Sequence, residues 1–146
     1  MIKFGKKISD VDKELPALVE LMSKKEDVLV MYLFGSRALN TADDLSDIDI
    51  ALLLKSNDTQ VEKEMDLLGE ITSMIKTDEV SLVVLNKAPL VIRYGVIKEA
   101  KVLYCADDNA RLDFEESVSK QYFDFKYFLN IYDHEFISIM QKGNVS

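Results

Sequence analysis

The feature that most constrains this chain is an apolar run that ends in Gly35-Ser36 and is followed, ten residues later, by Asp47-Ile48-Asp49. Residues 28–34 are short, apolar and rich in β-branched and aromatic side chains, a pattern typical of a buried strand. A glycine at the end of that strand lets a ligand approach the backbone closely. A helix that opens at Ser36 would present free N–H groups and its positive dipole end, and both favour phosphate.

Two carboxylates follow in a predicted second strand over residues 47–54. Asp47 and Asp49 are two residues apart, so their side chains point to the same face of that strand. Neighbouring carboxylates repel each other unless a cation lies between them, and Mg²⁺ is commonly held by one or two carboxylates plus substrate phosphates. An Asp-x-Asp alone is common on exposed strands. Its combination with Gly35-Ser36 predicts a site for a metal-bound nucleoside triphosphate, where Arg37 either adds a guanidinium or pairs with a carboxylate.

Patterns along the rest of the chain predict a mixed α/β (α+β) fold. Apolar residues at helical spacing predict a helix that starts near Pro16 within residues 14–22, and others over residues 59–76 and 89–100. A short helix over 36–41 and a polar loop over 41–46 separate the first two strands. Further strands are predicted over residues 80–85 and 101–105. We therefore expect a sheet of about four strands with helices packed against it.

The C-terminal segment reads as one long helix from about residue 107 to 140. Asp107-Asp108-Asn109 offers cap residues at its start. Its many aromatic residues are spread around more than one face, whereas packing on the sheet needs only one. The surplus indicates a surface for a partner.

Composition excludes several function classes. With 146 residues and 48% hydrophobic residues, the chain is expected to fold as a single domain over residues 1–146. The net charge of −8 argues against a nucleic-acid binder, because such proteins usually carry a basic face. No stretch approaches the ~18 apolar residues that a membrane span needs, so we expect a cytoplasmic protein with no membrane partner.

The Gly-Ser, ten-residue spacer and Asp-x-Asp pattern resembles the signature of the DNA polymerase β-like nucleotidyltransferase superfamily. The chain is most similar to its minimal, MNT-type members, which are antitoxin partners of HEPN-domain ribonuclease toxins. The resemblance covers nearly the whole chain, from the strand before Gly35 through residues 83–89, Arg93-Tyr94 and residues 101–104 to residues 122–126. The Gly-Ser and Asp-x-Asp motif is common to the superfamily, and the later segments point to the MNT type.

This resemblance implies the polymerase β-like fold and a two-metal transfer of AMP from ATP. Asp47 and Asp49 would be catalytic and would hold Mg²⁺, while Gly35, Ser36 and Arg37 would bind the nucleotide. An acceptor hydroxyl attacks the α-phosphorus and pyrophosphate leaves. In the MNT type the acceptor is a tyrosine of the HEPN toxin, and the added AMP silences the toxin.

One position departs from the family pattern. The family usually has a third carboxylate on the next strand, in a Val-Asp-Leu context, and this chain has Val80-Ser81-Leu82. A serine hydroxyl is neutral and is a poor metal ligand by comparison. Glu79 lies two residues earlier on the same face of the strand and is the candidate substitute as a catalytic residue. If Glu79 does not compensate, catalysis is slow or the protein acts by binding alone.

Three functions therefore remain open at the level of sequence. The first is an antitoxin that transfers AMP to a HEPN toxin, and the second is an antitoxin with the same fold that only binds the toxin. The third is a transferase acting on a small hydroxyl compound, as aminoglycoside adenylyltransferases do, although the chain is short for the extra substrate domain. The sequence leaves open the acceptor, the choice of ATP over other triphosphates, and self-association.

Overall fold

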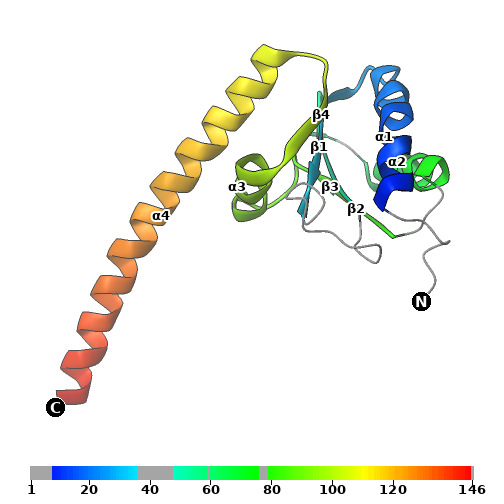
Figure 1. Ribbon diagram of the computed structural model, residues 1–146. Coiled ribbons are helices and arrows are strands. Elements are labelled where there is room, and N and C mark those ends of the chain that lie inside the picture. Colours follow the sequence, from blue (N-terminus) through cyan, green and yellow to red (C-terminus); the bar gives the residue numbers. More distant parts are fainter. Residues whose placement is uncertain (1–7, 36–47, 59, 76–78, 146) are drawn as a thin grey trace.

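The computed structural model describes residues 8–35, 48–58, 60–75 and 79–145 (Figure 1). Within these residues, four helices and four strands follow one another in the order α1 (Ile8–Ser23), β1 (Val28–Phe34), β2 (Ile48–Leu54), α2 (Val61–Ile75), β3 (Val80–Val84), α3 (Leu90–Glu99), β4 (Lys101–Cys105) and α4 (Asp108–Val145). The predicted mixed sheet with flanking helices and a long C-terminal helix is confirmed.

The strands form a single sheet in the order β3-β2-β1-β4. β1 runs antiparallel to both β2 and β4, whereas β2 and β3 are parallel. As a result, the C-terminal end of β1 lies beside the N-terminal ends of β2 and β3, at one end of the sheet. The residues that follow β1 and those that open β2 and β3 therefore meet at one end of the sheet.

Helices cover both faces of this sheet (Figure 1). On one face, α1 and α2 bury Leu18, Met22, Leu67, Ile71 and Ile75 against alternate residues of the strands. On the other face, α3 and the first turns of α4 pack on the intervening residues, including Tyr32, Ala51 and Leu53. β1 and β2 thus have apolar residues on both faces, which explains why their sequences are almost unbroken apolar runs.

The expected start of the first helix at Pro16 was wrong. α1 begins at Ile8 and contains Pro16. A proline inside a helix lacks the N–H that bonds to the carbonyl four residues earlier, and for that reason proline usually marks the first turn. Leu18 and Met22 are fully buried after it, so tertiary packing offsets the missing hydrogen bond here.

The other described elements lie close to their predicted positions. α3 begins directly after Pro89, and the Ala110 N–H donates to Asp107 Oδ1 at 3.1 Å, as expected of a capping residue. α4 continues to Val145, beyond the predicted end near residue 140. The helix predicted over 36–41 and the loop over 41–46 lie outside the described residues. None of the described helices is both long and apolar enough to cross a membrane.

Candidate nucleotidyl-transfer site

The end of the sheet at which β1 stops brings three residues into one row. Phe34 of β1 pairs with Asp49 of β2, and Asp49 pairs with Ser81 of β3. Residues paired across neighbouring strands share a face of the sheet. Asp49 alternates with Ile48 and Ile50 and therefore lies on the face covered by α3. It is half-buried, whereas Ser81 is exposed.

Gly35 lies directly against the Asp49 carboxylate. Its φ is +76°, in the left-handed region that side chains other than glycine rarely adopt. A Cβ added there would overlap Asp49 Oδ2 and lie only 3.2 Å from Cγ. The glycine is thus required both by its backbone conformation and by the space that the carboxylate occupies. A glycine at a strand end is also the residue type that allows close approach of the backbone to a ligand.

The strand pairing continues one residue before β3. The Ile48 N–H donates to the Glu79 carbonyl at 3.0 Å, so Glu79 is held at the opening of β2. Glu79 lies two residues before Ser81 and shares its face, in keeping with the alternation of a strand. Its side chain is half-buried. The residues that carry the Glu79 carboxyl group and the Ser81 hydroxyl group therefore lie beside β2, on the same face of the sheet as Asp49.

The polymerase beta nucleotidyltransferase family model matches residues 17–109, which include all four strands. The chain belongs to this family. The matched segment contains Gly35, Asp49, Glu79 and Ser81, which lie at the end of the sheet described above.

Several solved structures with the same fold are chains of toxin–antitoxin complexes. One is a tri-AMPylated Shewanella oneidensis HEPN toxin in complex with MNT antitoxin, with a TM-score of 0.66 and 20% identity over 87% of this chain and 98% of the other. Another is a toxin–antitoxin with AMP-PNP, with a TM-score of 0.66 and 22% identity over 89% and 98%. At this identity the likeness establishes the fold. No curated protein sequence matches the chain.

The described part of the nucleotidyltransferase site contains some of the predicted residues. Gly35 and Asp49 are in contact, and Ser81 and Glu79 lie along the neighbouring strand. Ser36, Arg37 and Asp47 lie outside the described residues. Their roles in phosphate and metal binding stay predictions, as do the roles proposed for Asp49 and Glu79.

A magnesium ion fits the chemistry of the described residues. Asp49 supplies a half-buried carboxylate at the end of the sheet, and carboxylate oxygens are ligands that Mg²⁺ prefers. Among the residues that the structure describes, no three His, Cys, Asp or Glu side chains form a metal-binding group. The predicted carboxylate pair depends on Asp47 and is therefore not tested by this observation.

Sequence reasoning did not single out Phe34. This aromatic residue is half-buried, pairs with Asp49 and lies on the same face of the sheet. It is the last residue before Gly35 and alternates with the buried Val30 and Tyr32. Its position directly before Gly35 is the feature of the sequence that could have pointed to Phe34. Phe34 is therefore the apolar residue paired with Asp49 on this face of the sheet.

Tyr32 lies behind the site on the same face. Its side chain is 1% exposed, and its hydroxyl has no hydrogen-bond partner in the described part of the chain. Burial, together with the Glu115 carboxylate on α4, raises the pKa of Tyr32 well above its ordinary value. The phenol therefore stays neutral at physiological pH and acts as part of the core.

Proposed function

We propose that this nucleotidyltransferase is an MNT-type antitoxin that transfers AMP from ATP to a tyrosine hydroxyl of a partner HEPN-domain toxin in the cytoplasm. The observation that carries the proposal is the contact of Gly35 with the Asp49 carboxylate at the end of the sheet. It joins a strand-ending glycine, a residue type that allows close approach of a ligand to the backbone, and a half-buried carboxylate within a chain of this family. Both features suit a metal-bound triphosphate.

The proposed reaction assigns a part to each residue. The Gly35 backbone, Ser36 and Arg37 hold the phosphates of ATP, and Asp47 and Asp49 hold Mg²⁺. The bound metal supplies charge neutralisation and makes the acceptor hydroxyl easier to deprotonate. The tyrosine oxygen attacks the α-phosphorus, the bond to the bridging oxygen of the β-phosphate breaks, and pyrophosphate leaves. The hydroxyl proton is released to solvent or to Glu79.

The choice of a toxin as the acceptor rests on the structural neighbours. Chains with this fold occur in a complex of a tri-AMPylated HEPN toxin with MNT antitoxin and in a toxin–antitoxin structure with AMP-PNP. The present chain covers 98% of the length of both matched chains. The likeness therefore extends over nearly the whole of each matched chain.

The test is transfer of labelled AMP from ATP to a purified HEPN-domain toxin. We expect Mg²⁺-dependent labelling with the parent and a loss of at least about 100-fold with Asp49→Asn, because the carboxylate that holds the metal is removed. Asp58→Asn is the matched control, because it makes the same change at an exposed position beyond the other end of β2. Equal labelling by Asp49→Asn and the parent would refute the proposed site.

A binding-only antitoxin is the second candidate, and Ser81 is the observation that favours it. Ser81 pairs with Asp49, and at the position where the family usually has a third carboxylate it offers only a hydroxyl. If catalysis is limited by this serine, Ser81→Asp raises the rate of AMP transfer by about ten-fold, equivalent to ~1.4 kcal/mol in the transition state. The rate of AMP transfer by Glu79→Ala tests whether Glu79 substitutes for the missing acid, because a lower rate than that of the parent is expected if it does. Toxin neutralisation by the Asp49→Asn variant, without labelling, would establish the binding-only function.

A further inference from the structure

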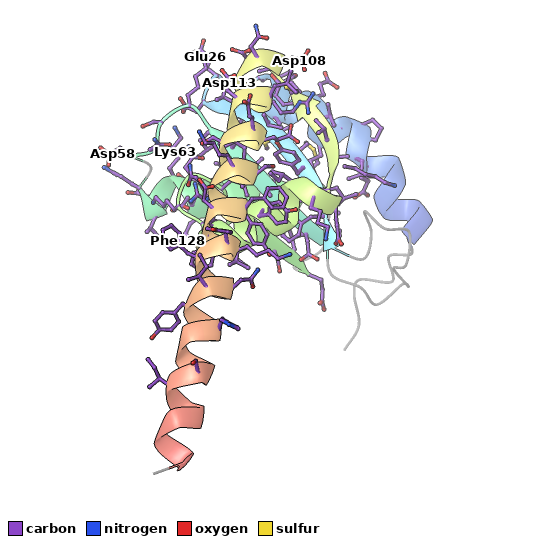
Figure 2. All side chains as sticks on the ribbon, turned by 90° about the vertical axis from the view of Figure 1, so that its left-hand side faces the viewer. Glu26, Asp58, Lys63, Asp108, Asp113 and Phe128 are labelled. Atoms are coloured by element: carbon purple, nitrogen blue, oxygen red, sulfur yellow. The ribbon has the colours of Figure 1, made fainter. Side chains whose placement is uncertain are left out.

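The first turns of α4 are fixed firmly to the body of the molecule. Val118 is 1% exposed, and Phe114 packs with the core on the α3 face of the sheet. The rings of Tyr122 and Tyr94 of α3 are stacked with centroids 3.8 Å apart, and Phe123 meets Tyr94 edge-on. Beyond these contacts α4 projects away from the sheet and the other helices in both views (Figures 1 and 2).

An apolar stripe continues along α4 after the helix leaves the body. Apolar residues follow Val118 at alternating spacings of four and three residues, the spacing of side chains that pack between helices: Tyr122, Phe125, Leu129, Tyr132, Phe136 and Ile139. Val118 and Tyr122 pack within the molecule. Phe125 and Leu129 are 41% and 42% exposed, and Ile139 is 67% exposed. We call the residues from Phe125 onward the heptad stripe, and it continues a surface that already packs against a helix.

A second stripe lies on the opposite side of the same helix. Phe123, Tyr127 and Ile131 follow one another at spacings of four residues, and half a turn separates them from the heptad stripe. They are 55%, 67% and 41% exposed. We call them the opposite stripe. Lys126 lies between the two stripes on a polar seam.

A helix with apolar residues on two sides is normally buried between other elements. Aromatic residues are weak helix formers, and most of the stability of helices in proteins comes from the packing of their apolar faces. We call residues 125–145 the outer part of α4. This part has apolar surface on two sides, and a partner that buries this surface would stabilise the helix. Because the first turns of α4 are packed on the body of the molecule, the helix loses little orientational freedom when that partner binds.

We infer that the outer part of α4 docks between helices of the HEPN-domain toxin and buries both stripes. This inference rests on the proposed function for the identity of the partner. A second copy of this chain fits less well, because a symmetric pair of α4 helices covers the same stripe on each copy and leaves the other stripe exposed. Two copies that each carry a net charge of −8 also repel each other.

The experiment measures toxin binding to the full-length chain by calorimetry in the absence of ATP. Leu129→Asp with Ile139→Asp alters the heptad stripe, and Tyr127→Asp with Ile131→Asp alters the opposite stripe. Lys126→Asp on the polar seam is the matched control, because it changes the net charge by the same two units in the same part of the helix. We expect each stripe variant to lose about 100-fold or more in affinity and the control to stay within about three-fold.

Mg-ATP binding by the same variants separates docking from folding. It should equal that of the parent, because the altered residues lie beyond the part of α4 that packs on the body. Toxin binding by either stripe variant within about three-fold of the parent would overturn the inference. So would light scattering showing that the parent is a dimer, that the heptad-stripe variant is a monomer, and that both bind toxin equally.

The outcomes also separate this inference from the proposed function. If the parent binds toxin through both stripes but transfers no AMP, the proposed chemistry fails and the docking surface stands. If the parent transfers AMP while the stripe variants bind toxin normally, the docking surface fails and the chemistry stands.

Discussion

At the scale of single residues, Gly35 is the position where conformation and chemistry are most closely joined. Gly35→Ala places a Cβ in the left-handed region and against Asp49 Oδ2, so either the backbone or the carboxylate must move. We expect the free energy of unfolding to fall by about 1–2 kcal/mol and Mg-ATP binding to be lost with it. Calorimetric titration of the folded variant checks the second effect. Gly69→Ala is the control, because a Cβ at Gly69, inside α2, meets nothing within 4 Å.

Tyr32 gives a second prediction at this scale. Its buried hydroxyl has no partner among the described residues, so Tyr32→Phe removes a desolvated polar group and should raise the free energy of unfolding by up to ~1 kcal/mol. The raised pKa adds a dependence on pH. Above pH 10, the ordinary value, the unfolded chain releases the phenol proton and the folded chain retains it, so the stability of the parent falls as the pH rises.

Urea unfolding of the parent and of Tyr32→Phe at pH 7 and above pH 10 measures both effects. The difference between the two proteins should grow at the higher pH, because only the parent has the buried phenol. Tyr127→Phe is the control, since that ring is 67% exposed. A Tyr32→Phe variant less stable than the parent at pH 7 would mean that the hydroxyl has a stabilising partner.

At the scale of elements, Asn86 in the turn after β3 is joined through its side chain to the end of β2. Its Oδ1 accepts from the Leu54 N–H at 2.9 Å, and its Nδ2 donates to the Leu54 carbonyl and to Asn57 Oδ1, each at 2.8 Å. Leu54 is 1% exposed, so Asn86→Ala leaves buried backbone groups unpaired. We expect the free energy of unfolding to fall by about 1–3 kcal/mol, measured as a lower urea midpoint with an unchanged slope. Asn57→Ala loses one exposed bond and should change stability by less than about 0.5 kcal/mol.

The sequence was a good guide to elements whose pattern is local. β1 and β4 have the predicted bounds because a short apolar run is both a propensity and a burial signal. The early start of α1 and the Asn86 link could not be predicted, since each depends on packing or pairing between distant segments. At the site, the motif predicted that Gly35 and Asp49 belong together. The contact between them, so close that a Cβ at Gly35 would clash with Asp49, follows from the antiparallel register of β1 and β2, which no local pattern encodes.

At the scale of the whole molecule, the fold divides α4 into a part that belongs to the core and a part that does not. The buried and stacked residues of α4 end near Tyr122, whereas the exposed stripes lie mainly beyond it. A chain that ends after Asp124 should therefore keep the two apolar cores and the Gly35–Asp49 contact. We expect its thermal midpoint to stay within about 5 °C of the parent, with equal Mg-ATP binding and no measurable toxin binding. Circular dichroism should show only the loss of helix that the deletion removes.

A second, shorter truncation also removes the part of α4 that packs on the sheet. A chain that ends after Leu112 also loses Phe114 and Val118, which cover the α3 face of the sheet. Exposing that face should lower the free energy of unfolding by several kcal/mol, because two large or fully buried apolar side chains are removed. Thermal unfolding followed by circular dichroism compares the two chains directly. If both truncations unfold at the same temperature, the boundary near Tyr122 is wrong. If the longer chain is as unstable as the shorter one, the outer part of α4 stabilises the body, and its stripes serve the fold of this chain itself.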